Sequence, residues 1–309
     1  IIREEDIPVL LSVGKDSVYI WENDETMMHE NDAAEVLYRM TANEHMHPSD
    51  VKEGKIEAIA DTEGLLKVDR EKLKKVNAFG EMMIATRHGN TVVKKGDKLA
   101  GTRIIPLVIK KDKMQEAEKI CDGTPILKIL PFTVKKAAII TTGNEVYHGR
   151  IKDAFTPVIE QKIAEFGAEM MFHEIFDDND RKITDGCLRA IEAGADIVFC
   201  TGGMSVDPDD KTPLAIKNTG AEMISYGSPV LPGAMFLLSY YRKGDKVIPI
   251  CGLPGCAMYN RRTIFDLVLP RLMAADPVTA DELASLGEGG LCLNCKVCTF
   301  PNCGFGKGW

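Results

Sequence analysis

The chain has 309 residues, of which 45% are hydrophobic and 27% charged, and its formal net charge is −8. This length allows two domains, each with a hydrophobic core of its own. The negative charge argues against a general nucleic-acid-binding protein, which would need a basic surface. No apolar run reaches the roughly 20 residues that span a bilayer, and the first residues do not resemble a secretory signal. We therefore expect neither nucleic acid nor a membrane as a partner.

The first residue is Ile1 rather than Met, so we expect an N-terminally incomplete chain. Five of the nine cysteines are scattered along the sequence, and without a secretory signal they are typical of reduced thiols in the cytoplasm. These five are Cys121, Cys187, Cys200, Cys251 and Cys256.

Residues 1–134 predict a β-rich or α+β accessory domain. Apolar side chains recur at helical spacing over residues 32–40, after a polar cap. Short β-type runs follow, separated by turn residues such as Gly89-Asn90 and Gly96-Asp97. The expected strands are 56–60, 65–68, 82–86, 91–93 and 104–109. His45 and His47 form at most half of a metal site, and the favoured interpretation is a solvated loop.

From Lys135 the pattern changes to alternating strands and helices, which predicts a three-layer α/β/α domain with a mainly parallel sheet over residues 135–273. The run 137–141 is continuously apolar, as expected for a strand that is covered on both faces. Expected strands are 137–141, 168–176, 196–201, 221–226, 233–241 and 246–251, and the expected helices lie near 155–166, 183–191, 213–218 and 256–273. Residues 274–309 are expected to form a linker and a cysteine-rich tail.

Three glycine-containing loops follow strands of this domain. They contain Thr142-Gly143-Asn144-Glu145, Thr201-Gly202-Gly203-Met204-Ser205 and Gly252-Leu253-Pro254-Gly255. In an open α/β sheet, ligands bind outside the carboxyl ends of the strands. Glycine permits positive φ, and backbone N–H groups together with the hydroxyls of Thr142, Thr201 and Ser205 suit an anion. One such loop is usually only a tight turn, but three together indicate a site, and neither a dinucleotide fingerprint nor a P-loop is present.

Carboxylates flank these loops. Asp178 follows the second strand of the domain, and Asp210 follows the Gly-Gly loop. Beside a phosphate they would repel the ligand unless Mg²⁺ bridged them. Helix capping is an equally open interpretation for both, and it is favoured for Asp180 and Asp207. Lys211 is the candidate cation.

With these motifs in order, residues 135–273 resemble the molybdopterin-binding family, which includes MogA-type and MoeA-type proteins and the cofactor-binding domain of CinA. The resemblance implies that the Gly-Gly and Pro-Gly loops hold a pterin phosphate, and that Asp178 and Asp210 act in catalysis and bind Mg²⁺. The residues it implies for molybdopterin binding are Thr142, Gly143, Glu145, Thr201, Gly202, Gly203, Ser205, Lys211, Gly252, Pro254 and Gly255. It also implies a homo-oligomer.

Residues 3–14, residues 92–103 and Leu231-Pro232-Gly233 resemble the MoeA branch. That branch implies an enzyme that inserts molybdate into adenylylated molybdopterin with release of AMP, whereas the MogA branch implies the adenylyl transfer itself. Two departures from the usual motifs weaken the expectation of catalysis. Cys256-Ala257 stands where Asn-Pro is usual, and Ser205-Val206 is followed by Asp207-Pro208 where Gly is usual. The alternative is a non-catalytic carrier or sensor that delivers the cofactor to a molybdoenzyme client, and an unrelated nucleotide-binding protein is a third hypothesis.

Four cysteines crowd the C-terminal tail. Cys292, Cys295, Cys298 and Cys303 are separated by two, two and four residues. Such spacing favours a thiolate-bound metal, with an iron–sulfur cluster slightly preferred over zinc. A tail of reduced cysteines without a metal is the alternative.

Overall fold

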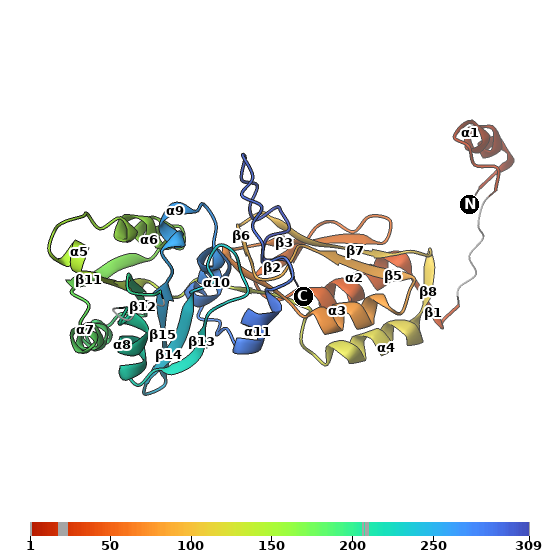
Figure 1. Cartoon of the computed structure of the whole chain (residues 1–309). Helices are drawn as coiled ribbons and strands as arrows, with labels where there is room; N and C mark the ends of the chain where they lie inside the picture. Colours follow the sequence, from red (N-terminus) through yellow and green to blue (C-terminus); the bar gives the residue numbers. More distant parts are fainter. Residues whose placement is uncertain (1, 18–23, 206, 208–209, 309) are drawn as a thin grey trace.

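A computed structural model describes residues 2–17, 24–205, 207 and 210–308. Figure 1 shows two bodies side by side, an N-terminal region and an α/β region, with the C-terminal tail between them. The first short helices, η1 (Glu4–Asp6) and α1 (Ile7–Ser12), are drawn apart from both bodies. Among the helices of the described residues, none is both long enough and apolar enough to cross a membrane.

The N-terminal region has an α+β architecture. Its elements are β1 (Met27–His29), α2 (Glu30–Thr41), β2 (Met46–Pro48), β3 (Lys55–Ala60), β4 (Gly64–Val68), α3 (Arg70–Asn77), β5 (Met82–Thr86), β6 (Thr91–Val93), β7 (Lys98–Ile104), β8 (Val108–Lys110), α4 (Lys111–Cys121) and β9 (Leu127–Leu130). They form sheets of order β2-β3-β7-β5, β6-β4-β9 and β1-β8. The core cluster of this region contains Leu37 of α2, Ile56 of β3 and Ile104 of β7, all of which are buried.

Two expectations for this region need correction. The strand expected at 104–109 is wrong, because β7 ends at Ile104 and β8 begins at Val108. Ile105 and Leu107 between them are 57% and 48% exposed, so the apolar run is a surface connection. Helices α3 and α4 were not expected at all, since their sequences are dominated by lysine and glutamate.

The α/β region is a three-layer structure, as the sequence predicts. Its elements are β10 (Lys136–Thr142), α5 (Asn144–Tyr147), α6 (Phe155–Ala164), β11 (Glu169–Phe176), α7 (Asp180–Glu192), β12 (Ile197–Thr201), α8 (Thr212–Asn218), β13 (Glu222–Tyr226), β14 (Leu237–Lys243), β15 (Lys246–Leu253), α9 (Cys256–Tyr259), α10 (Ile264–Met273) and α11 (Ala280–Ser285). The sheet order is β11-β10-β12-β15-β14-β13. Strands β11, β10, β12 and β15 are mutually parallel, and β14 is antiparallel to both of its neighbours.

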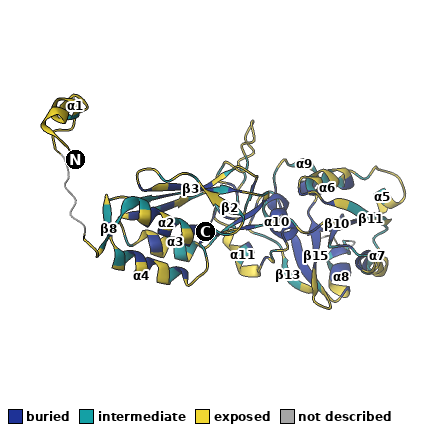
Figure 2. Cartoon of the chain, turned by 180° about the vertical axis from the view of Figure 1, so that it is seen from behind, coloured by how far each residue is buried: buried dark blue, intermediate teal, exposed yellow. Residues whose placement is uncertain are grey.

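Each face of this sheet packs on a different pair of helices. On one face Ile139 and Phe199 contact side chains of α6 and α10, and on the other Ile140 and Val198 contact side chains of α7 and α8. Figure 2 shows the buried strands enclosed between these helices. Because β10 and β12 are covered on both sides, their sequences are continuously apolar.

The single helix expected at 256–273 is wrong. The chain forms α9, leaves the helical path at Asn260, and starts α10 after Thr263. Thr263 and Asp266 make a capping box, in which the Thr263 hydroxyl accepts from the Phe265 N–H and Asp266 accepts from the Thr263 N–H at 2.8 Å. This reciprocal cap satisfies N–H groups that the start of a helix leaves without partners, so it fixes a new start there.

The C-terminal tail, residues 289–308, packs on the α/β region. Cys292 N–H donates to the carbonyl of Leu231 at 2.8 Å, and Phe305 is only 6% exposed. The Arg262 guanidinium lies 4.8 Å from the centre of the Phe300 ring. The tail therefore contributes side chains to the core of this region.

Candidate functional site

The sheet topology places four strand ends side by side. Thr142 of β10 pairs in register with Phe176 of β11, Thr141 pairs with Thr201 of β12, and Thr201 pairs with Leu253 of β15. Because these strands are parallel, the segments after them leave from one edge of the sheet. The structure thus brings together the three glycine loops and the aspartates that follow β11. We call this set of loops the strand-end edge.

The Gly-Gly loop crosses directly over the end of β10. A Cβ atom on Gly202 would lie 2.1 Å from the carbonyl oxygen of Thr142, and one on Gly203 would lie 2.8 Å from the Thr212 hydroxyl. Both residues also have positive φ, 80° and 54°. Gly143 likewise has a φ of 128°. Glycine is therefore required here by loop-on-loop packing as well as by backbone conformation.

The Gly-Leu-Pro-Gly loop uses glycine differently from the expectation. Gly255 has an ordinary φ of −53°, and Gly252 is not among the residues of positive φ. Instead, a Cβ atom on Gly252 would lie 2.4 Å from the Met204 methyl carbon. Met204 thus joins the second loop to the third, and Pro254 is buried beside them while Gly255 is exposed.

The threonine side chains of the edge are buried inside the protein. Thr142 Oγ1 donates to the carbonyl of Thr201 at 3.0 Å and lies 3.0 Å from Thr212 Oγ1. Thr201 is fully buried, and its Oγ1 has no described hydrogen-bond partner. Only Ser205 is exposed among the three predicted hydroxyl donors. Thr142 thus connects the first loop, the second loop and the start of α8.

Asp178 joins the second strand end to the first loop. Its carboxylate accepts from the Asn144 N–H at 3.1 Å, which is a capping contact for the short helix α5. Burial raises the pKa of Asp178; the Asn144 hydrogen bond opposes this, and the charges of Glu145, Asp210 and Asp177 raise it further. Asp178 therefore lies among carboxylates whose charges disfavour its ionisation.

Lys211 directly precedes α8, next to Asp210, and both residues are half-buried. Tyr226 was not expected at the site. Its hydroxyl donates to the carbonyl of Met204 at 3.1 Å, and burial and the charge of Asp210 raise its pKa. Val206 and Pro208, which belong to the departures noted above, lie outside the described residues.

The two cysteines beside the third loop, Cys251 and Cys256, are poorly suited to bind a metal as thiolates. Cys251 is fully buried, and burial raises the pKa of its thiol and of the Cys256 thiol. A raised pKa disfavours the thiolate that binds metals. Cys251 therefore packs as a core thiol, and burial disfavours metal binding by either thiol.

The expected metal groups are not assembled in the described part of the chain. Across those residues, no three or more His, Cys, Asp or Glu side chains are placed to hold a metal ion. In the tail, Cys295 and Cys298 are exposed, whereas Cys292 and Cys303 pack toward the core of the α/β region. Of the two histidines considered above, His47 contacts Asp61 at 2.6 Å.

Comparisons with known proteins agree on this half of the chain. Residues 138–274 match the family model described as "Probable molybdopterin binding domain". A putative competence-damage inducible protein of Bacillus cereus (strain B4264) is 30% identical over 129 residues, which are 42% of this chain and 30% of that protein. Its counterpart in Bacillus subtilis (strain 168) is 32% identical over 85 residues, 28% of this chain and 20% of that protein.

Among solved structures, the tungsten cofactor synthesizing protein MoaB from Pyrococcus furiosus aligns with a TM-score of 0.39 and 18% identity, over 47% of this chain and 98% of that one. The chain thus spans less than a third of the length of the two curated relatives named above. The segment that matches the molybdopterin-binding family model contains all three glycine loops, Asp178 and Asp210.

Proposed function

We propose that residues 138–274 bind the phosphorylated pterin molybdopterin at the strand-end edge, and that the protein acts in molybdenum cofactor assembly. The observation that carries this proposal is the interlocking of the Gly-Gly loop with β10 through Thr142 and Thr212. That contact holds glycine backbone at the ligand-binding edge of the sheet, where N–H groups can approach a phosphate closely. The family match over the same residues supports the pterin as ligand.

Within this proposal, Asp178 and Asp210 act on the phosphate side of the site. The charge of Asp210 contributes to the raised pKa of Asp178, so the two carboxylates interact. A divalent cation such as Mg²⁺ would supply neutralisation of carboxylate and phosphate charge there. The protein's own contribution is to orient the phosphate and to hold the two carboxylates on one side of it.

The finer role that we propose is promotion of molybdate insertion into adenylylated molybdopterin. Adenylyl transfer is the related alternative, and a non-catalytic carrier is the second candidate function. The carrier is favoured by Cys256-Ala257 at the third loop, by the hydrogen bond that engages the Thr142 hydroxyl, and by the burial of Thr201.

The experiment compares the full chain with Asp210→Asn, using adenylylated molybdopterin, molybdate and Mg²⁺. We expect the wild type to release AMP, and the variant to lose at least about a hundredfold in rate while its pterin affinity changes only a few fold, because charge neutralisation acts on turnover. Asp281→Asn, an exposed aspartate of α11, is the control and should keep full rate. Tight pterin binding without AMP release would contradict the enzymatic role and support the non-catalytic carrier. If the protein did not bind the pterin at all, both proposed functions would be wrong.

The cysteine tail enters the proposal separately. We propose that Cys292, Cys295, Cys298 and Cys303 bind iron–sulfur or zinc after a local rearrangement, since the described positions do not bring three ligands together. Iron and zinc analysis with a visible spectrum of anaerobically purified protein tests this. Protein without either metal would remove it.

We also propose the region boundaries at about residues 134 and 273, and a homo-oligomer as the working state. Limited proteolysis tests the boundaries, because cleavage should concentrate where few contacts cross. Sedimentation equilibrium tests the oligomer, and a monomer at all concentrations would exclude it.

A further inference from the structure

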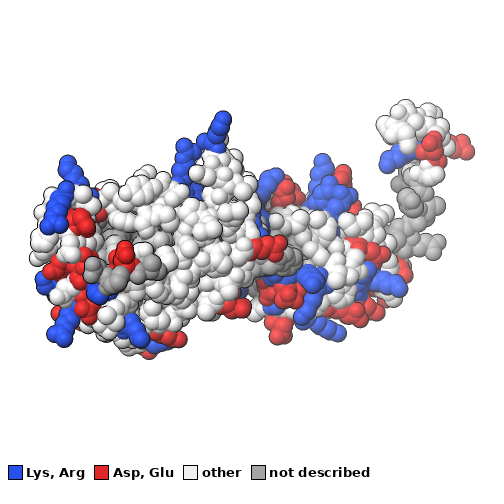
Figure 3. Space-filling view, viewed as in Figure 1, with Lys and Arg blue, Asp and Glu red and all other residues white. Residues whose placement is uncertain are grey.

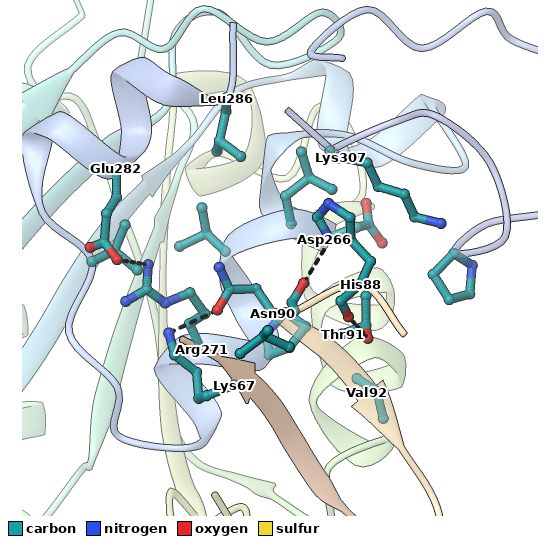
Figure 4. A pocket seen from close by; sticks show the side chains of 18 of the residues that line it. Lys67, His88, Asn90, Thr91, Val92, Asp266, Arg271, Glu282, Leu286 and Lys307 are labelled. Carbon is teal, nitrogen blue, oxygen red and sulfur yellow. Dashed lines mark hydrogen bonds and ion pairs between the residues drawn. The ribbon is translucent and has the colours of Figure 1, made fainter. Parts of the chain in front are cut away.

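A cavity of about 810 Å³ lies where the N-terminal region meets the α/β region. Its walls come from β4 and the segment before β6 on one side, from α10 and α11 on the other, and from residues 300–308 of the tail. Figure 4 shows Lys67 and Asn90 beside Arg271 and Glu282, with His88 and Lys307 on the other side of the view. Sites for small molecules are typically 300–1,000 Å³ and often lie at domain junctions. None of the loops of the strand-end edge contributes to this cavity.

The cavity has an apolar wall. Side chains from all three parts of the molecule form it: Val68 and Val92 from the N-terminal region, Leu267, Val278 and Leu286 from the α/β region, and Phe300 and Phe305 from the tail. Phe305 is 6% exposed and Val278 is 3% exposed, so this wall continues the hydrophobic core. Such a surface suits the flat apolar body of a ligand.

The acidic groups deepest in the wall are already paired. Asp266, whose side chain is 3% exposed, contacts Lys162 and Arg262. Glu282 contacts Arg271 at 2.8 Å. The lining acids without an ion pair among the described residues are all exposed: Glu63, Glu71, Glu165 and Asp281.

Three of the basic residues that line the cavity are not paired in this way. Arg70, His88 and Lys307 are half-buried and line the cavity, and none has an acidic partner within 4 Å among the described residues. Arg70 Nη1 donates to the carbonyl of Gly308 at 3.3 Å, so Arg70 lies next to the backbone that carries Lys307. His88 Nδ1 lies 2.9 Å from the carbonyl oxygen of Gly89. Arg70 and Lys307 are far apart in sequence, yet both line the cavity, and the Arg70 guanidinium lies beside the backbone next to Lys307.

We propose that this cavity is a second ligand site, which binds a small aromatic anion, with the ring against the apolar wall and its phosphate or carboxylate group at Arg70 and Lys307. Anionic groups bind strongly to such side chains because the hydrogen bonds are charge-assisted. The site does not depend on the pterin proposal, since it shares no residue with the strand-end edge. The tail forms part of the site, so ligand binding also holds the tail against both regions.

The test uses the full chain and 1-anilinonaphthalene-8-sulfonate, an aromatic anion that fluoresces when bound, with its uncharged relative N-phenyl-1-naphthylamine as a second probe. We expect one anionic probe per chain. In the double variant Arg70→Gln with Lys307→Gln, the affinity for the anion should fall at least about tenfold. The affinity for the uncharged probe should stay within twofold, which shows that the cavity itself remains.

The matched control is Lys74→Gln with Lys75→Gln, which removes two positive charges from exposed positions of α3 and should leave both affinities unchanged. Displacement of the probe by 1-naphthyl phosphate and by 1-naphthoate then distinguishes a phosphate from a carboxylate ligand. The proposal is overturned by an absence of stoichiometric binding, by unchanged anion affinity in the double variant, by equal weakening of both probes, or by displacement with neither acid.

Discussion

The strand-end edge and the junction between the two regions both collect charged residues, but they treat them in opposite ways. At the edge, Asp178 lies near Glu145, Asp177 and Asp210, and its pKa is raised by burial and by these charges. At the junction, Asp276 accepts from Arg271 at 2.5 Å and from Lys67 at 2.8 Å. Burial would raise the pKa of Asp276, but these contacts outweigh burial and lower it.

The difference separates the carboxylates of the proposed pterin site from an ion-pair network that stabilises the contact between the two regions. Groups whose ionisation is disfavoured by their neighbours are typical of functional sites, because a ligand or ion is needed to complete them. Groups that are fully compensated stabilise the arrangement in which they are found. In Figure 3, the face of the molecule seen there has a mixture of acidic and basic side chains over both bodies and no large patch of one sign. The difference between the edge and the junction therefore lies in the local contacts of their charged groups, and single substitutions should reveal it.

The largest effect is expected for Gly202→Ala at the edge. The new Cβ would lie 2.1 Å from the Thr142 carbonyl oxygen, and φ is 80°, so backbone must move. We expect the free energy of unfolding to fall by at least about 3 kcal/mol in urea denaturation. Gly220→Ala is the control, because it has a φ of 83° with no atom within 4 Å and should cost only about 1 kcal/mol. Equal losses would show that conformation alone, and not loop packing, requires Gly202.

The sequence predicts the parts of the edge that depend on topology. Continuous apolar runs identify β10 and β12, because strands covered on both faces need no polar side chain. Alternation of strands and helices then implies parallel strands, whose ends must share one edge. This is why the three loops and Asp178 could be placed together before any coordinates.

Features that depend on tertiary packing were out of reach. The engagement of the Thr142 hydroxyl by Thr201 and Thr212 joins residues 59 and 70 positions apart. Tyr226 reaches the second loop from β13, and no local pattern announces it. The start of α10 is different, because Thr263 and Asp266 have the sequence spacing of a capping box.

The second-largest loss of stability is expected for Arg271→Met at the junction. The Arg271 side chain is 7% exposed and contacts Asp276 and Glu282, so its removal leaves two half-buried acids with fewer partners. We expect a loss of about 2–3 kcal/mol in the free energy of unfolding. Arg242→Met is the control, since its contact with Glu222 is 3.5 Å long and exposed, and should cost under about 0.5 kcal/mol. Similar losses in both variants would mean that the junction network contributes no more than a surface pair.

The smallest effect concerns the pH dependence of the free energy of unfolding. Here one substitution at the edge is expected to stabilise the protein, whereas the two substitutions above destabilise it. The pKa values of Asp276 and Glu282 are lowered in the folded protein, so their stabilisation is present above the unfolded pKa values near 4 and is lost as pH falls through the folded values. The pKa of Asp178 is raised, so its ionisation costs stability at neutral pH, and this cost disappears as pH falls below the unfolded value. Asp178→Asn keeps an oxygen that can accept from the Asn144 N–H while removing the charge.

We therefore expect Asp178→Asn to be as stable as wild type at pH 3 and more stable by about a few tenths of a kcal/mol at pH 7, discounted for solvent screening. Urea denaturation at both pH values measures this difference. In Asp276→Asn the trend should reverse, with a loss at pH 7 that shrinks toward pH 3. A loss of stability at pH 7 in Asp178→Asn would show that its capping contact outweighs the repulsion among the carboxylates, and the edge would then resemble the junction.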